Sequence, residues 1–407
     1  MWGRLDLTPG QVGENFELHQ CSPEGEMTTT FDLIVVGAGP GGSNAAAVAL
    51  RQGLSVVQLE RYRVPRVKPC GGGVTMKSWN ALRLDPLAVV RGEFAEVEVN
   101  VWQRSQNRFS HPPAPLLRTV VRSQFDDYLV SQNQKSPGFQ FFDNERVVDI
   151  KYDGRFRVHT AKQILFGRQL VGADGAYGIV NRVFSIGCPK GYAVAVEVTL
   201  RRDQATLPVE TPPSFDIGAV DRGYGWVFPK DDHWNVGLYT LGKSKTLRQQ
   251  LTTYIAAKGF QVKTDPLATF EAHRFPYGGY RVSVPKAPVY LVGDAGGFGD
   301  ALTGEGIYHG LESGRIAGET AYDYLAGKLG YQAYYRRLRR SVLADTFVTY
   351  QAARAFYRNL DRAAALVENS LVWRPLIRGY ATGVTLTEVL RRGGWRISAA
   401  ARARVGG

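Results

Sequence analysis

The stretch from residue 31 to Glu60 constrains the fold more than any other part of the 407-residue chain. Residues 31–36 (FDLIVV) are short, apolar and rich in β-branched side chains, which is typical of a buried parallel strand. A glycine-rich turn, an Ala-rich helix expected over 43–52 and a second strand over 54–59 follow. This order predicts a βαβ unit of a doubly wound sheet.

The turn reads G-x-G-x-x-G, and each glycine has a physical purpose. Gly37 permits the tight turn, Gly39 lets the backbone approach a pyrophosphate, and Gly42 lets helix and strand pack closely. The helix N-terminus attracts phosphates, and Glu60, 18 residues after Gly42, can accept hydrogen bonds from ribose hydroxyls. The sequence therefore predicts a dinucleotide site that includes Gly37, Gly39, Pro40, Gly41, Gly42, Glu60 and Arg61.

Two later segments place a short acid beside glycine after a strand-like run, "LVGADG" with Asp174 and "YLVGDAGG" with Asp294. The second leads through "LTGEGI" into a helix expected over 305–326, whose N-terminus can face an anion or a flavin edge. Together these segments resemble the flavoprotein superfamily of the p-hydroxybenzoate hydroxylase type. The resemblance implies FAD, with Asp294 on the ribityl chain and Arg122 of "VVRSQFDDYL" in contact with the cofactor. The further FAD residues it implies are Cys70, Gly71, Asp174, Gly293, Gly304, Gly306 and Ile307.

Other cofactor chemistries find little support in the sequence. A second G-x-G-x-x-G in strand–helix context is absent, so we expect no separate NAD(P)H domain. Cys70 has no C-x₄-C partner, which disfavours thiol–disulfide chemistry, and the scattered histidines predict no metal site. Three cysteines give no disulfide framework and indicate a reducing, cytoplasmic compartment.

The segment 221–241 alternates Tyr224, Trp226 and Phe228, so in a strand these rings share one face. Such a face is either a core layer or the wall of an apolar pocket, and the periodicity alone does not choose. The surrounding segments, about 95–120 and 190–280, alternate like antiparallel strands. They predict a sheet-based substrate domain inserted into the dinucleotide domain.

Two motifs narrow the resemblance. "YGWVFPK" (224–230) followed by "NVG" (235–237), and "KPCGGG" (68–73), resemble signatures of the geranylgeranyl reductase family over a match from about 31 to 327. The resemblance implies reduction of isolated C=C bonds of prenyl chains on lipids by reduced FAD, with NADPH or ferredoxin as the external reductant. Ala301 stands where the family has proline, so we expect a looser turn there. The residues implied for substrate are Gly72, Gly73, Tyr224, Trp226, Phe228 and Pro229, and those for catalysis are Cys70, Tyr224 and Trp226.

The proton donor stays open between Cys70 and water, and no base is visible near Cys70 in the sequence. The glycines 71–73 are expected to let backbone lie against the flavin and to leave room for a prenyl chain. Two other functions remain alternatives on the same fold. One is a flavin monooxygenase, a hydroxylase or epoxidase acting on an apolar substrate, and the other is a membrane-associated flavoprotein passing electrons to quinone.

The net charge of +13 belongs mainly to the C-terminal segment. Residues 331–407 hold fourteen Arg, no Lys and four acids, a net charge of +10 against +3 for the first 330 residues. This segment predicts a continuous helix from 331, with an apolar stripe of Leu338, Val342, Leu343 and Phe347 that caps the substrate cavity. Its arginines suit an anionic membrane surface, and no motif accompanies them that would indicate nucleic acid.

The sequence thus predicts an α/β chain (α+β overall) with a Rossmann-type FAD-binding domain, an inserted, mostly antiparallel substrate sheet and a C-terminal helical segment. We expect 1–27 to be a disordered tail without the apolar core of a signal peptide. The FAD domain is expected over 28–95, 117–188 and 280–330, the substrate domain over 96–116 and 189–279, and the basic segment over 331–407. No apolar run reaches the ~18 residues of a membrane span, so membrane contact is expected to be peripheral, at the inner face.

Overall fold

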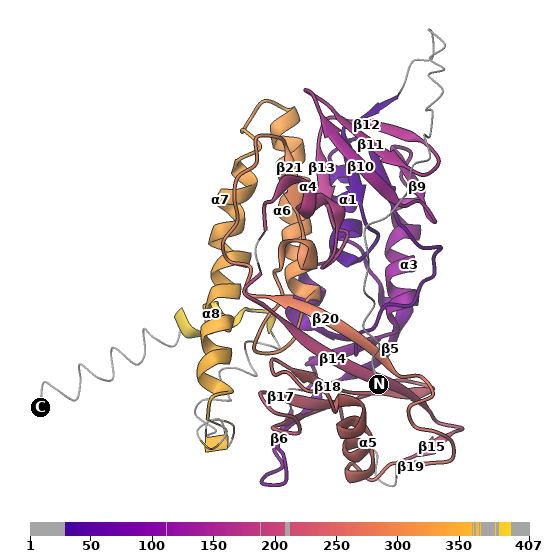
Figure 1. The fold of residues 1–407 in the computed structure, drawn as a ribbon, viewed down its shortest axis with the longest axis vertical. Coiled ribbons are helices and arrows are strands. Elements are labelled where there is room, and N and C mark those ends of the chain that lie inside the picture. The colour runs from indigo at the N-terminus through magenta and orange to yellow at the C-terminus, as the bar shows by residue number, and fades with distance from the viewer. Residues whose placement is uncertain are drawn as a thin grey trace, which may run out of the picture.

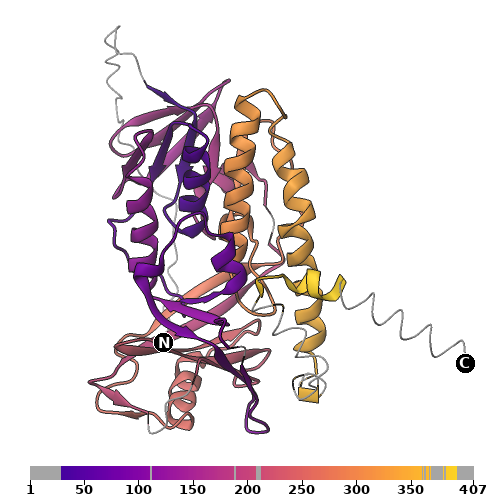
Figure 2. The same cartoon turned by 180° about the vertical axis from the view of Figure 1, so that it is seen from behind.

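The computed structural model describes residues 29–359 apart from 111, 188 and 208–211, and beyond them 361, 364, 365, 367, 379 and 382–391. The expected tail over 1–27 and the last residues of the chain lie outside the described residues. The described chain forms two stacked β-sheet lobes, with long helices along one side of both (Figure 1). Figure 2 shows from behind that the C-terminal helices run beside both lobes.

One lobe is built on a five-stranded parallel sheet with the order β21-β13-β2-β3-β9. The carboxyl ends of β2, β13 and β21 meet at one edge, which is where ligands bind in open parallel sheets. All four residues of β2 are buried, as its unbroken apolar sequence predicts. The strands are β2 (Leu33–Val36), β3 (Val56–Leu59), β9 (Phe139–Phe142), β13 (Leu170–Gly172) and β21 (Val289–Leu291).

Helices α1 (Pro40–Arg51), α3 (Arg122–Asn133) and α6 (Ile307–Leu325) pack on this sheet. Helix α1 begins at Pro40 rather than at the expected residue 43, because proline fits the first helical turn. Helices α1 and α6 touch through backbone: a Cβ added at Gly314 would lie 2.2 Å from the Gly41 carbonyl oxygen. This contact fixes the start of α1 beside the start of α6.

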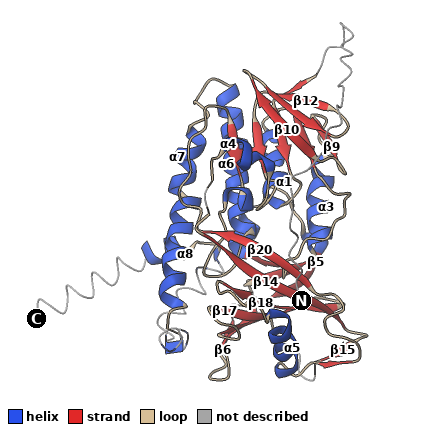
Figure 3. Ribbon diagram, viewed as in Figure 1, coloured by secondary structure: helices blue, strands red, loops and turns tan. Residues whose placement is uncertain are grey.

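The second lobe is a seven-stranded sheet with the order β20-β14-β18-β17-β16-β6-β7. Every neighbouring pair is antiparallel except β16 with β6, which is parallel. Helix α5 (Leu247–Ala257) covers one face and the other face turns toward the parallel-sheet lobe (Figure 3). The strands are β6 (Glu96–Val101), β7 (Arg108–Ser110), β14 (Gly191–Arg201), β16 (Ser214–Ile217), β17 (Gly223–Pro229), β18 (His233–Thr240) and β20 (Glu271–Tyr277).

Smaller elements complete the described fold. A sheet of order β1-β12-β11-β10 extends the first lobe, β4-β8-β5 lies between the lobes, and β15 pairs with β19. The strands are β1 (Thr30–Phe31), β4 (Gly73–Thr75), β5 (Val90–Phe94), β8 (Leu117–Val120), β10 (Val147–Tyr152), β11 (Phe156–Thr160), β12 (Ile164–Gly167), β15 (Ala205–Thr206) and β19 (Gln261–Val262). The short helices are α2 (Met76–Ala81), η1 (Leu87–Val89), α4 (Ile179–Phe184) and η2 (Gly293–Gly296).

The C-terminal segment is not one continuous helix, so that prediction is wrong. Helices α7 (Ala333–Arg340) and α8 (Val342–Phe356) are separated at Ser341, whose φ of −117° and ψ of −89° are not helical. The Tyr335 hydroxyl bonds the Val289 carbonyl at 2.5 Å, and the Tyr334 hydroxyl bonds that of Leu291. These bonds fix α7 on the edge strand β21, and α8 follows it after the interruption at Ser341.

The apolar stripe is only partly buried. Leu338, Val342 and Leu343 lie in the core, whereas Phe347 is 44% exposed and contacts the Tyr280 ring edge-on. The end of α8, not α7, reaches the cavity between the lobes. The sheets and helices as a whole confirm the predicted α/β class with an added antiparallel sheet and C-terminal helices.

Candidate functional site

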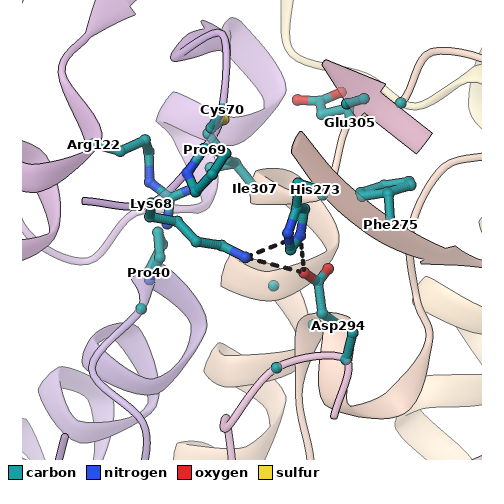
Figure 4. A pocket seen from close by; sticks show the side chains of 18 of the residues that line it. Pro40, Lys68, Pro69, Cys70, Arg122, His273, Phe275, Asp294, Glu305 and Ile307 are labelled. Atoms are coloured by element: carbon teal, nitrogen blue, oxygen red, sulfur yellow. Dashed lines mark hydrogen bonds and ion pairs between the residues drawn. The ribbon is translucent and has the colours of Figure 1, made fainter. Parts of the chain in front are cut away.

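A cavity of about 1300 Å³ lies between the carboxyl edge of the parallel sheet and the open face of the large sheet. Its walls combine both motif groups, because the glycine-rich turns, the aromatic strand β17 and the "KPCGGG" loop all line it. Figure 4 shows side chains from the two lobes converging on it. Of the residues expected in the site, only Pro229 does not line this cavity.

The glycine-rich end fits a dinucleotide. Helix α1 starts without a side-chain cap, so its first N–H groups are free for an anion. A Cβ at Gly39 would meet only the end of Arg66, 4.0 Å away, so ligand can approach this backbone closely. A Cβ at Gly37 (φ +111°) would lie 2.2 Å from the Ala173 carbonyl oxygen, which explains the glycine there. The buried Oδ1 of Asp174 has no hydrogen-bond partner among the described residues, as expected of a group that awaits a ligand.

A chain of ion pairs borders this end. Arg122 bonds Asp126 at 2.8 Å, Asp126 bonds Arg66 at 2.9 Å, and Arg66 bonds Glu60 at 3.0 Å. Arg122 and Asp126 pair because they lie one turn apart on α3. The structure thus places Arg122 at the cavity with its guanidinium already oriented. Arg66 was not predicted; its partner Glu60 is six residues away, but Asp126 comes from a helix 60 residues further along the chain.

Lys68, His273 and Asp294 form a second polar cluster, drawn with dashed lines in Figure 4. Lys68 Nζ lies 3.0 Å from His273 Nε2, and Asp294 Oδ2 lies 4.0 Å from the former and 3.7 Å from the latter. Burial lowers the pKa of Lys68 against the attraction of Asp294. Burial alone would raise the pKa of Asp294, but His273 and Lys68 hold it below its ordinary value. The cluster joins the expected ribityl-binding acid to the substrate sheet, and only Asp294 was predicted.

Tyr224, Trp226 and Phe228 of β17 form an aromatic wall. Neighbouring ring centroids lie 6.2 and 6.3 Å apart, and all three side chains face the cavity. The alternation of a strand turns Pro229 to the opposite face and leaves it outside the lining of this cavity, and its role as a substrate contact stays a prediction. Of the two interpretations left open by the periodicity, the structure combines both: the three rings line the cavity, and Trp226 and Phe228 also belong to a buried hydrophobic cluster.

The returning strand β18 supports this wall. Asn235 Oδ1 accepts a hydrogen bond from Trp226 Nε1 at 2.7 Å. Gly237 pairs with Trp226 across the ladder, and a Cβ there would lie 2.2 Å from the indole ring. The "NVG" segment therefore belongs with "YGWVFPK" because it holds and accommodates the tryptophan.

The glycines of "KPCGGG" are required by the wall itself. Cβ atoms at Gly71 and Gly73 would each come within 2.9 Å of the Phe228 ring. Gly72 has φ +71°, and a Cβ there would lie 2.0 Å from the Val120 carbonyl oxygen. The Cβ positions of these glycines are thus occupied by protein, although all three line the cavity, and the expectation that they leave room for a prenyl chain stays a prediction. The two motifs pack against each other.

The acid nearest to Cys70 comes from a distant strand. Glu197 Oε1 of β14 accepts a hydrogen bond from the Cys70 N–H at 2.9 Å, and the Cys70 Sγ accepts one from the Gly72 N–H at 3.4 Å. The thiol is free. Glu197 lies 127 residues away in the sequence and bonds the Cys70 backbone N–H rather than the thiol, so the expectation that nothing near Cys70 supplies a base stays a prediction.

The turn before α6 is well ordered without proline. Asp300 Oδ1 accepts hydrogen bonds from the N–H groups of Leu302 and Thr303, at 2.7 and 3.1 Å. The Gly304 N–H bonds the Asp300 carbonyl, and Ala301 is fully buried. The expected loosening at Ala301 is wrong, because the Asp300 side chain closes the turn. Helix α6 then begins, like α1, without a side-chain cap and at the cavity.

Several known proteins are similar to this chain in sequence. Residues 32–174 match the family described as FAD dependent oxidoreductase. An uncharacterized protein of Methanosarcina barkeri is 32% identical over 361 residues, 88% of this chain and 92% of that protein. Menaquinone reductase of Mycolicibacterium smegmatis is 31% identical over 72% of this chain and 76% of its own. Digeranylgeranylglycerophospholipid reductase 2 of Methanopyrus kandleri is 27% identical, with 72% and 76% covered.

A solved structure shares the fold. The geranylgeranyl bacteriochlorophyll reductase-like protein of Thermoplasma acidophilum superposes with a TM-score of 0.71 at 20% identity, over 90% of this chain and 98% of that one. Within the described part of the chain, no helix combines the length and apolarity needed to cross a membrane.

Proposed function

The chain belongs to the geranylgeranyl reductase-like family of FAD-dependent oxidoreductases, and from this premise we propose that it reduces C=C double bonds of a prenyl chain on a lipid. The observation that carries the proposal is the aromatic wall, which faces the same cavity as the FAD-binding turns. An unactivated alkene offers no charge to bind, so it has to be held by shape beside the cofactor.

Residues at the glycine-rich end hold the cofactor in this proposal. The uncapped starts of α1 and α6 would hold its phosphates and ring, Glu60 would hold its ribose, and Asp294 its ribityl chain. When bound in its reduced form, after reduction by NADPH or ferredoxin, FAD would supply the hydride that one alkene carbon accepts.

The chain's own residues perform the remaining tasks. Trp226 and Tyr224 present ring faces that stabilise positive charge as it develops on the second carbon. The Tyr224 hydroxyl and the Trp226 N–H are engaged with Thr303 and Asn235, so the rings are fixed and their faces stay apolar. Cys70 Sγ–H, at the boundary between loop and wall, donates the proton to that carbon. Apolar side chains such as Phe215 and Phe356 exclude water.

The test is anaerobic. Purified protein is reduced with dithionite and mixed with a geranylgeranyl lipid, and the masses of the products are measured by mass spectrometry. We expect two added hydrogens per double bond. Products that carry oxygen and form only in air would favour a monooxygenase instead. Rapid reduction of quinone without alkene saturation would favour electron transfer.

We also propose that the enzyme meets its lipid at an anionic membrane surface. Arg336, Arg339 and Arg340 are exposed on α7, opposite the face that packs on β21. Leu390, 54% exposed, lines the cavity near the end of α8, so an apolar chain can enter from that side. The part that the last dozen residues play lies outside the described chain.

A further inference from the structure

Behind the "KPCGGG" loop lie two buried groups of opposite charge that the proposed reaction does not use. Glu197 of β14 and Lys230, directly after β17, are 7% and 4% exposed. Burying charged groups is costly unless each finds polar partners. Glu197 and Lys230 both have polar partners on the loop. The sequence analysis expected neither residue in the site.

The two groups hold one short piece of backbone. Glu197 Oε1 accepts from the Cys70 N–H at 2.9 Å, and Lys230 Nζ donates to the Gly71 carbonyl, also at 2.9 Å. A carboxylate on an N–H and an ammonium on a C=O are charge-assisted bonds, roughly twice as strong as neutral ones. Together they grip the backbone on both sides of the Cys70–Gly71 peptide.

The rest of the motif completes the anchor. Asn235 accepts from Trp226 Nε1 through Oδ1, which turns its amide nitrogen toward Glu197. On the other side, the Val120 N–H donates to the Gly72 carbonyl at 2.9 Å. The loop is thus bonded at three successive residues, and glycine at 71 and 73 lets it lie flat on the aromatic rings.

We propose that Glu197 and Lys230 are positioning residues that clamp the Cys70–Gly71 backbone and so set where the Cys70 thiol stands against the aromatic wall. The clamp rests on the geometry of this loop, and its consequence for alkene reduction rests on the proposed function. The clamp predicts that removing either charged group frees the loop, while the aromatic wall and the glycine-rich turns remain in place.

The clamp can be tested without cofactor or substrate. In a Cys21→Ser, Cys188→Ser background, Cys70 is the single thiol, and its alkylation by iodoacetamide is followed by mass spectrometry. Hydrogen bonds to charged groups contribute about 1.5–3 kcal/mol, so Lys230→Met and Glu197→Leu are expected to speed alkylation about tenfold or more. Glu197→Gln keeps an oxygen for the Cys70 N–H and is expected to stay within about threefold of the parent.

Matched controls remove charge without touching the loop. Lys243 and Glu96 are exposed and lie outside the loop, so Lys243→Met and Glu96→Gln are the controls. Both are expected to alkylate at the parental rate. If Lys230→Met or Glu197→Leu fails to fold, Lys230→Gln and Glu197→Gln carry the test: Lys230→Gln is expected to speed alkylation while Glu197→Gln does not.

A second readout links the clamp to turnover. With reduced flavoprotein and a geranylgeranyl lipid, Lys230→Met is expected to lower kcat about tenfold with little change in KM, because the wall that binds substrate is intact. Unchanged alkylation in folded Lys230→Met and Glu197→Leu proteins overturns the clamp. If the variants alkylate faster as expected but the parental protein never saturates an alkene, the proposed function is overturned and the clamp is not.

Discussion

Gly72 shows how a residue beside a reactive centre can be dictated by the protein's own backbone. Its φ of +71° belongs to the region that favours glycine, and the Val120 carbonyl oxygen occupies the position of a Cβ. Gly154 also has a positive φ, +98°, but nothing lies within 4 Å of its Cβ position. Comparing Gly72 with Gly154 therefore separates the energetic cost of the positive φ from the cost of a clash with a neighbouring atom.

We expect Gly72→Ala to lower the free energy of unfolding by about 3 kcal/mol or more, because strain and overpacking each cost about 1–3 kcal/mol. Gly154→Ala should cost only about 1–2 kcal/mol, from the left-handed backbone alone. Urea denaturation of both variants measures the difference. Equal losses would mean that the Val120 contact adds nothing.

Lys230 gives stability a specific pH dependence. Burial lowers its pKa from 10.5 to about 8, against the attraction of Glu197, Cys70, Asp232 and Asp231. The folded state therefore releases this proton more readily than the unfolded state. The cost of the buried charge is fully present below pH 8 and is lost as pH rises from 8 toward 10.5.

Relative to Lys230→Met, the parent is expected to gain about 2 kcal/mol of unfolding free energy between pH 7 and 9.5, at 1.36 kcal/mol per pKa unit. Chemical denaturation of both proteins at a series of pH values measures this gain. A difference that stays constant with pH would show that Lys230 does not titrate in this window. Ionisable groups that do not interact with Lys230 are common to both proteins and cancel, whereas the shifts of Glu197 and His233 include the charge of Lys230 and differ between them.

At the scale of elements, the contact between α1 and α6 was missed, although the sequence carries a signal for it. Gly310, Gly314 and Gly318 recur every four residues, which places them on one helix face. Cβ atoms at Gly314 and Gly318 would lie 2.2 and 2.7 Å from carbonyl oxygens of α1. The spacing alone predicts a helix face without side chains. It does not predict which helix packs against that face, because this depends on the order of the strands in the sheet.

The sign of the stability change in Gly314→Ala tests this contact between α1 and α6. Helix propensity alone would stabilise the variant by about 1 kcal/mol. Overpacking against the Gly41 carbonyl is instead expected to destabilise by about 1–3 kcal/mol and to weaken FAD binding, because the start of α1 is displaced. Flavin fluorescence titration and urea denaturation measure both. Gly330→Ala, whose Cβ would meet only the flexible end of Gln332, is the control.

For the whole molecule, motifs that act within a few residues could be predicted and contacts between lobes could not. The turn at Gly37–Gly42 and the alternation of Tyr224, Trp226 and Phe228 are local, so the sequence was sufficient. Glu197, Lys230, His273 and Arg66 reach the site through strand register and loop placement. Their contacts therefore cannot be predicted until the pairing and register of the strands are known.

The charge distribution is also a property of the whole chain, and it yields a last prediction. Helix α7, which carries the exposed Arg336, Arg339 and Arg340, and the yellow segment 382–391, which carries the exposed Leu390, are drawn along the same side of the fold in Figure 2. Each basic residue near an anionic surface contributes about 1 kcal/mol, so changing all three to Gln should weaken binding to anionic vesicles by about 100-fold.

The matched control changes Lys243, Lys245 and Arg248 to Gln, which removes the same charge from exposed positions beside α5 on the other lobe. Co-sedimentation with vesicles of anionic lipid at low salt compares the two triple variants with the parent. We expect only the α7 variant to lose binding, and high salt to abolish the difference because it screens the surface charge. Equal losses in both would mean that net charge, rather than the α7 face, attracts the membrane, and the entry route beside Leu390 would then lose its support.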